Sequence, residues 1–303
     1  MFEFIADILA IPVSFIYKII PNYGWTIIIF TIILKLLTMP MTIKSQKSMA
    51  RMQQVQPLIN EIQRKYANNR EKMQQELMRV YDKYQISPTG GCMPLILQLV
   101  VMMGFIEIVY RPYTYLLSIP KSEIAAIAGK TAAQNQLSLT AEHFEKLAAK
   151  GYSTQLDLNF LGFDLSKVLQ NNMGDILMWV LPVLAVLLTI LSAVVSQRQA
   201  TQRQNKNAKN DAQAQQTAAM NKSMLIMMPV MTAWITYSWP LGCALYWIIY
   251  TITQMAQQFF INQFIVKKMK PIELKRKKKK KPLPQNNMAE KEVIDVEEEK
   301  SEE

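Results

Sequence analysis

The sequence predicts an all-α membrane protein with five transmembrane helices, a cytoplasmic helical hairpin and an N-terminal interfacial helix. Two observations lead to this prediction. Half of the 303 residues are hydrophobic, and they gather in long stretches rather than spreading out as in a soluble core. A bilayer core needs about 20 mostly apolar residues per helix. Lys and Arg also concentrate in alternate connecting segments, which is typical of a chain that crosses a membrane several times.

The first segment, residues 1–23, is apolar but contains Glu3, Asp7 and Lys18. A secretory signal peptide begins with positive charge and ends at a small-residue cleavage site, and this segment shows neither. We therefore predict an amphipathic helix that lies in the membrane interface and ends at a Pro-Asn break. A sixth span is the alternative interpretation.

Five later stretches have the length and apolar character of membrane spans, although the fourth is short and rich in Met. Their predicted bounds are residues 24–43, 89–110, 175–196, 223–239 and 242–265.

Basic residues predict how these spans are oriented. Cytoplasmic loops carry an excess of Lys and Arg. Here the excess lies in residues 44–88, 197–222 and 266–303, and the last segment contains the run KRKKKKK. Residues 111–174 are much sparser in basic residues. We therefore predict that the first three segments and the C-terminus are cytoplasmic and that the loop 111–174 is extracytoplasmic.

The first cytoplasmic segment has a pattern of its own. Apolar residues recur at spacings of three and four on both sides of Asn68-Asn69, which predicts two amphipathic helices joined by a turn. Two such helices form an antiparallel hairpin. A hairpin with a solvated basic surface is the favoured interpretation, because charge runs usually solvate a face. A docking arm for a partner is the alternative.

Lys35 is the most informative residue. It lies about eleven residues into the first span, roughly 16 Å deep at 1.5 Å per residue and near the bilayer midplane. A lysine there costs at least ~2.5 kcal/mol on insertion scales. The acidic Glu107 lies near the outer end of the second span, so an ion pair with Lys35 is not expected. The charge therefore needs water, and we predict a hydrated functional cavity around it.

Polar side chains share a face with Lys35 and recur on other spans, where they predict a common cavity that is wettest towards the cytoplasm. Interhelical hydrogen bonding is the alternative, since Thr and Gln commonly supply it. The residues are Thr31, Thr38 and Thr42 beside Lys35, Gln98 on the second span, and Tyr246, Tyr250, Thr253 and Gln257 beside Trp247, Thr251, Gln254 and Gln258 on the last.

Catalytic and metal-binding signatures are not visible. Cys92 and Cys243 have no metal-type or redox-type spacing, and His143 has no partner motif in its polar loop. The sequence shows no Gly-rich phosphate loop and no nucleophile elbow. We predict a protein that is not an enzyme and that needs no cofactor or metal.

Three motifs, taken together and in this order, resemble the YidC family of membrane protein insertases. The resemblance covers most of residues 12–270. The motifs are ILKLLTMPMTIKSQKSMARMQQVQPLINEIQRKY, SPTGGCMPLILQ and MPVMTAWITYSWPLGCALYWIIYTITQMAQQ.

The resemblance implies a five-span core with a hydrophilic groove that is open to the cytoplasm and the lipid and closed to the outside. Nascent membrane proteins would enter the bilayer through it. The predicted substrate groove comprises Lys35 as its basic residue, Thr31, Gln98, Tyr246 and Trp247 by motif position, and Thr38, Tyr250 and Gln257 from the polar stripes.

The sequence differs from the family pattern in two ways, and each difference leads to an expectation about this protein. The family often has Arg where this chain has Lys35. The pKa of a buried Lys shifts more readily than that of a buried Arg, so the family pattern does not imply that Lys35 is permanently charged. The sequence shows neither the large periplasmic domain of Gram-negative members nor a lipoprotein Cys near its start. We therefore expect the compact type typical of Gram-positive bacteria.

The implied partners are nascent membrane proteins, the ribosome through the basic tail, the Sec translocon and the signal recognition particle pathway. The tail would also bind anionic lipid at ~1 kcal/mol per charge. A channel or transporter is the alternative function, because it also needs a polar intramembrane cavity. Such proteins usually show inverted repeats or paired broken helices, and none is apparent in the sequence.

Overall fold

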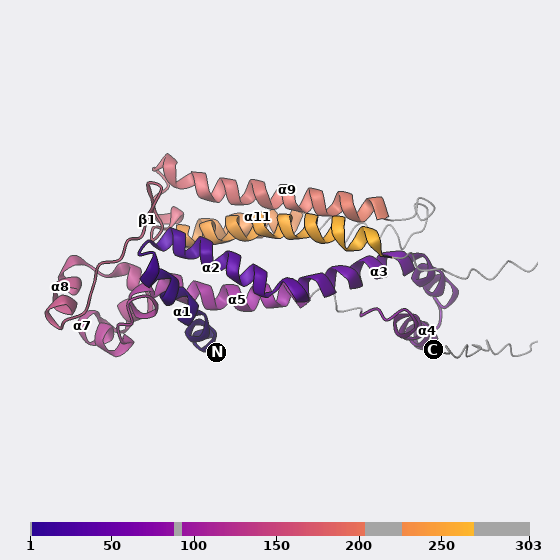
Figure 1. Cartoon of the computed structure of the whole chain (residues 1–303), viewed down its shortest axis with the longest axis horizontal. Helices are drawn as coiled ribbons and strands as arrows, with labels where there is room; N and C mark the ends of the chain where they lie inside the picture. Colours follow the sequence, from indigo (N-terminus) through magenta and orange to yellow (C-terminus); the bar gives the residue numbers. More distant parts are fainter. Residues whose placement is uncertain (1, 88–92, 204–225, 270–303) are drawn as a thin grey trace, which may run out of the picture. The chain divides into compact units, whose positions relative to one another are not determined.

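The computed structural model describes residues 2–87, 93–203 and 226–269 (Figure 1). These residues are helical except for turns, loops and one antiparallel hairpin, β1 (Asn159–Phe160) with β2 (Phe163–Asp164). Most of the basic loop 197–222 and of the charged tail 266–303 lies outside the described residues, as does the start of the second predicted span.

The helical elements follow one another in an order close to the predicted one. They are α1 (Phe2–Ile19), α2 (Tyr23–Leu37), α3 (Met39–Lys65), α4 (Arg70–Lys83), α5 (Met93–Tyr110), α6 (Pro112–Tyr115), α7 (Lys121–Gln134), η1 (Gln136–Ser138), α8 (Ala141–Ala149), η2 (Leu169–Asn171), η3 (Ile176–Trp179), α9 (Val180–Arg203), a helix over 226–238, α11 (Leu241–Phe264) and η5 (Val266–Lys268).

The core forms where the long helices meet. Helix α11 packs against α2 on one side and α9 on the other, and α1 lies against α5 and α2 (Figure 1). Phe30 of α2 stacks on Phe105 of α5 at 5.9 Å between ring centroids, and Phe105 stacks on Tyr246 of α11 at 4.6 Å. This aromatic stack joins three of the helices that carry predicted groove residues.

Helices α2 and α3 meet at a bend of 55° beside Thr38. The predicted first span, 24–43, runs past this point, so the structure breaks the helix earlier than the sequence suggested. Pro40 supplies the reason, because it stands in the first turn of α3. A proline lacks an amide hydrogen and its ring collides with the carbonyl four residues before it, which here belongs to Leu36. The chain therefore leaves α2 at Leu37 and restarts as α3.

Apolarity alone does not identify five spans in the described residues. One helix there, Ile176–Gln199, is long and apolar enough to cross a bilayer, and the bent pair α2–α3 qualifies if its two halves count as one span. The apolar stretch Ile96–Tyr110 is shorter. Helix α11 has 24 residues, but its last turns carry several Gln side chains, which lower its hydropathy.

The described part of the predicted hairpin is formed by α3 and α4, which pack against each other. Asn69 begins the second helix, because its side chain accepts a hydrogen bond from the backbone N–H of Lys72 at 3.1 Å. Such a bond satisfies one of the free amides at a helix start. Since α3 is continuous from the bend at Thr38 to Lys65, this arm is a direct extension of the helix that follows α2.

The segment 111–174 is a folded unit rather than an open loop. Its helices α6, α7 and α8 enclose a second, small apolar cluster built around Tyr113, Ile124 and Leu147. His143 takes a structural part in it, since its Nδ1 accepts the backbone N–H of Thr140 at 3.1 Å and caps α8.

The hairpin end of this segment caps two long helices. The backbone N–H of Tyr23, at the start of α2, donates to the carbonyl of Asp157 at 3.0 Å. The N–H groups of Leu241 and Gly242, at the start of α11, donate to the carbonyls of Lys167 and Leu165, both at 2.9 Å. A helix start leaves four amides unsatisfied. The segment therefore fixes where α2 and α11 begin, and we call this part of the bundle its loop end.

Helix α1 has two apolar faces. One packs on α5, where Gly104 leaves room for Ile5, since a side chain at Gly104 would come within 2.6 Å of it. The other is exposed and consists of Phe4, Ile8, Ile11, Phe15 and Ile19.

Both ends of α1 meet the loop end. Glu3 pairs with Arg111 at 2.7 Å and with Lys121 at 2.8 Å, and near the other end the hydroxyl of Tyr17 accepts the backbone N–H of Asp157 at 3.1 Å. Hydrogen bonds from Lys121 and Arg111 lower the pKa of the Glu3 carboxyl to about 2. These ion pairs are therefore present at neutral pH and are lost only in strong acid, as the pH falls through the lowered pKa.

Arg111 holds this network together. It is 8% exposed, contacts Glu107 at 3.0 Å as well as Glu3, and donates to the carbonyl of Gln134. We expect Arg111→Gln to lower the free energy of unfolding by about 1–3 kcal/mol, because it removes a buried guanidinium that bonds two carboxylates and a backbone carbonyl. The control is Lys146→Gln, which breaks the exposed pair with Glu142 and should change stability by less than about 0.5 kcal/mol. Thermal unfolding in detergent is the measurement, and equal effects of the two variants would contradict the prediction.

Candidate functional site

The site is built around Lys35, in the last turn of α2. The residue is 4% exposed, so its ammonium group lies inside the protein and not at a surface. Two features of the helix favour a cation there. The carboxyl end of a helix carries the negative end of the macrodipole. The bend at Thr38 then turns the chain away and opens a recess beside the side chain.

Helix α11 supplies the contacts of the Lys35 ammonium. Its Nζ donates to Oε1 of Gln254 at 2.5 Å and lies 3.3 Å from the ring centroid of Tyr250. No carboxylate pairs with Lys35 among the residues that the structure describes. The expected absence of an acidic partner therefore holds among these residues, while an amide oxygen and an aromatic face, which the sequence-based prediction did not assign to Lys35, contact its ammonium.

Gln257 holds the backbone of the same residue. Its Nε2 donates to the carbonyl of Lys35 at 2.7 Å, while its Oε1 is buried without a hydrogen-bond partner in the described part of the chain. A buried amide oxygen of this kind usually finds an ordered water. Tyr250, Gln254 and Gln257 are spaced by four and three residues, so one face of α11 makes all three contacts.

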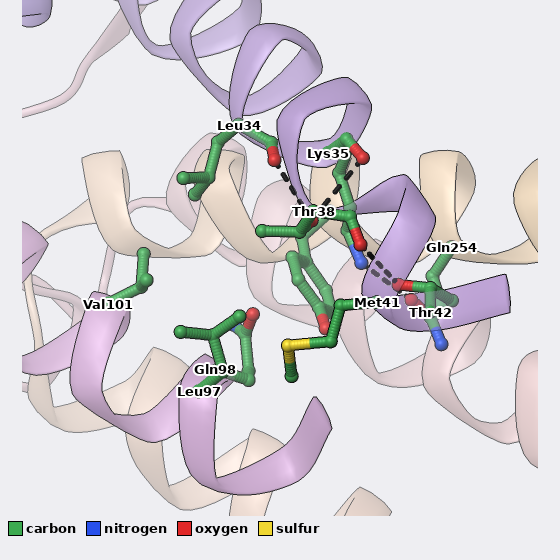
Figure 2. Close-up of a pocket in the computed structure, with 10 residues that line it drawn as sticks. Leu34, Lys35, Thr38, Met41, Thr42, Leu97, Gln98, Val101 and Gln254 are labelled. Atoms are coloured by element: carbon green, nitrogen blue, oxygen red, sulfur yellow. Dashed lines mark hydrogen bonds between the residues drawn. The ribbon is translucent and has the colours of Figure 1, made fainter. Parts of the chain in front are cut away.

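A pocket opens beside Lys35 between α2, the start of α3, α5 and α11 (Figure 2). It contains about 30 Å³ of water-accessible space, which is room for about two water molecules. Its wall mixes polar and apolar side chains, namely Leu34, Lys35, Thr38, Met41, Thr42, Leu97, Gln98, Val101, Tyr250 and Gln254.

The structure brings half of the predicted groove residues to this pocket, and two more, Tyr246 and Gln257, bond residues that line it. Lys35, Thr38, Gln98 and Tyr250 line it directly. Gln98 also reaches across from α5 and donates from Nε2 to the hydroxyl of Tyr246 at 3.1 Å. The pocket wall is therefore tied together by hydrogen bonds between helices.

Two predicted residues lie elsewhere. Thr31 is fully buried, and its hydroxyl donates to the carbonyl of Ile27 in its own helix at 2.6 Å. Trp247 faces α9, where its Nε1 donates to the hydroxyl of Thr189 at 3.2 Å. Neither lines the pocket.

Gln254 was predicted to belong to the common polar cavity but was not included in the substrate groove, although it makes the hydrogen bond to the Lys35 ammonium. The sequence does contain a signal for it, because Gln254 follows Tyr250 by four residues and so lies one turn further along the same face of α11.

The side chains that line the pocket are suited to binding. The pocket offers a cation, amide groups and hydroxyls, which suit an anionic or hydrogen-bond-accepting group. Among the described residues no three His, Cys, Asp or Glu side chains are placed to hold a metal ion.

A bundle of helices that includes one long apolar helix fits an α-helical membrane protein. The profile of the 60Kd inner membrane protein family matches residues 15–269. The chain belongs to this family of bacterial inner membrane proteins, and the resemblance to YidC insertases drawn from its motifs is confirmed.

Several relatives carry the name membrane protein insertase YidC. The protein from Syntrophobacter fumaroxidans is 29% identical over 269 residues, which cover 86% of this chain and 38% of the relative. The protein from Nitratidesulfovibrio vulgaris (strain DP4) is 38% identical over 136 residues, or 43% of this chain and 26% of the relative. The protein from Endomicrobium trichonymphae is 39% identical over 112 residues, which cover 37% of this chain and 22% of the relative. The matches thus span less than two fifths of these relatives' own length.

The pocket makes a prediction about water access. In a chain whose two native cysteines are replaced, we expect Thr38→Cys to react with a small charged thiol reagent, because Thr38 lines the open pocket and a thiolate formed there can attack the reagent. Thr31→Cys should be protected by burial, and Leu37→Cys, which is 75% exposed on the outside of the bundle, should be protected by lipid. Rates of modification in membranes are the measurement. A Thr38→Cys rate equal to the Leu37→Cys rate would mean that the pocket is dry.

Proposed function

We propose that this chain is a membrane protein insertase that passes nascent membrane proteins into the bilayer through a hydrophilic groove around Lys35. The observation that carries the proposal is the buried ammonium, held by α11 beside a water-sized pocket, in a chain of this family. Intramembrane charges are expensive and are functional by default. The relatives' shared name supports the same role, which is not an enzymatic one.

The proposed mechanism is electrostatic. Insertion must move a polar segment across ~30 Å of hydrocarbon, and a hydrated notch shortens that path. A positive charge in the notch attracts acidic residues of the passing segment, strongly where solvent is partly excluded. The apolar part of the client then leaves sideways into lipid by its own hydrophobicity. A pocket with room for about two waters is a resting state, and client entry must widen it.

The proposed arrangement in the membrane has five spans, formed by α2 with the start of α3, α5, α9, the 226–238 helix and α11. The loop end lies outside the cell, and the α3–α4 arm and the charged tail lie in the cytoplasm. Helix α1 lies in the outer interface, because both of its ends meet the loop end while its exposed face is apolar.

The proposed partners follow from this arrangement. Nascent membrane proteins are the clients. The basic tail, outside the described residues, contacts the ribosome through phosphate groups and anionic lipid at the membrane surface. Work beside the Sec translocon or with the signal recognition particle pathway is part of the same proposal.

Substitutions of Lys35 test the mechanism. We expect Lys35→Ala to slow insertion of a reporter with an acidic translocated tail more than insertion of a neutral-tail reporter. Lys35→Arg should keep activity because Arg stays protonated when buried. Lys35→Glu should be worse than Ala, since like charges repel in a low-dielectric site. The measurement is the insertion rate of both reporters in cells depleted of any paralogue.

The outcomes separate the proposal from its main alternative. Equal insertion of both reporters by every Lys35 variant would remove the charge from the mechanism. Undisturbed insertion after complete depletion of the protein, together with loss of a solute or ion flux, would favour a channel or transporter.

Labelling at Arg70, at the start of α4, tests the orientation. We expect Arg70→Cys to react with an impermeant thiol reagent only after the cells are opened, because the arm is cytoplasmic in the proposed topology. A cysteine at the exposed Leu161, in the β1–β2 turn, is the matched control and should react in intact cells. The reverse pattern would invert the topology.

A further inference from the structure

We propose that Tyr250 and Gln254 are positioning residues that hold the Lys35 ammonium inside the pocket, where it can meet the carboxylate of a client. The proposal rests on the insertase function above and adds to it the residues that make a lysine effective at this place. It assigns α11 a specific part in recognising acidic segments.

The geometry shows a two-sided hold on the ammonium. Oε1 of Gln254 accepts a hydrogen bond from Nζ, and the ring of Tyr250 presents its face to the same atom with 3.3 Å to the ring centroid. Both contacts come from one face of α11 and one turn apart, while Gln257 fastens the Lys35 carbonyl a turn further on. Figure 2 shows the Lys35 side chain directed towards Gln254 at the edge of the pocket.

A lysine needs such a hold more than an arginine does. Its ammonium is a compact charge on a flexible four-carbon stem, without the rigid fork of a guanidinium. Lys side chains near a helix end can extend towards water and leave the apolar region. Lys35 lies in the last turn of α2, so an unrestrained ammonium could move out of the pocket towards the α3 arm. The cation–π contact and the amide oxygen oppose that movement.

A second glutamine of α11 provides a matched control. Gln258, one turn after Gln254, accepts a hydrogen bond from Ser196 of α9 at 3.0 Å. The two glutamines belong to the same helix and each bonds a neighbouring helix, but only Gln254 contacts Lys35. Replacing either by Met keeps a similar side-chain volume and removes the acceptor.

The experiment measures the ratio of insertion rates for the acidic-tail and neutral-tail reporters. We expect Gln254→Met and Tyr250→Leu to lower this ratio by roughly three- to tenfold, in the direction of Lys35→Ala. Tyr250→Phe keeps the ring face and should keep the wild-type ratio, as should Gln258→Met. In a Lys35→Ala background, Gln254→Met and Tyr250→Leu should change the ratio no further, because their effect acts through the ammonium. The amount of each variant in the membrane is measured alongside.

Three results would overturn the positioning role. A wild-type ratio in Gln254→Met and Tyr250→Leu, with a lowered ratio in Lys35→Ala, would leave the proposed insertase function in place and remove α11 from recognition. An equal loss for both reporters that persists in the Lys35→Ala background would assign the two residues to packing. If Lys35→Ala keeps the wild-type ratio, the proposed charge mechanism is wrong, and the positioning role of Tyr250 and Gln254 is wrong with it.

Discussion

The burial of one ammonium group between α2 and α11 is the constraint around which the described helices are arranged. A lysine in the apolar layer is costly unless other groups replace its water. Here the replacement comes from an amide oxygen and an aromatic face of α11. The polar groups that solvate Lys35 therefore have to lie on a helix that would otherwise be a simple apolar span. Gln254, one of the residues that lower the hydropathy of α11, meets this requirement, and the recess beside the bend at Thr38, which Pro40 produces, leaves room next to the ammonium.

Local signals in the sequence predicted local structure well. The Pro-Asn break before α2 and the Asn pair between α3 and α4 act through their own backbone, so they can be read without knowing the fold. Pro40 is a similar signal whose consequence falls several residues earlier, at the end of α2. The depth of Lys35 could be predicted because a charge in an apolar stretch is visible in one dimension, but its partner on α11 lies more than two hundred residues away.

The polar stripes show where one-dimensional reasoning loses information. In the sequence, Thr and Gln were treated alike as polar residues inside spans. In the structure they differ in which groups their side chains are long enough to contact. The short hydroxyls of Thr31, Thr38 and Thr251 donate to the carbonyl four residues earlier in the chain. A Thr hydroxyl is linked to another helix where a longer side chain reaches it, as Trp247 reaches Thr189. The longer amides of Gln98 and Gln254 extend to other helices. In a membrane chain a buried Gln is therefore the stronger sign of an interhelical contact or a site.

The folded segment 111–174 gives the site its register. Its hairpin region accepts the first amides of both α2 and α11, at Tyr23 and Gly242. Lys35 lies twelve residues after Tyr23, and Gln254 lies twelve residues after Gly242. At 1.5 Å per residue both side chains stand about 18 Å along their helices from one common cap. Two helices that start at the same level and run in the same direction bring these residues opposite each other. The segment 111–174 carries no binding motif, yet it fixes where α2 and α11 begin. It thereby sets the level in the bundle at which the Lys35 ammonium contacts the Gln254 amide.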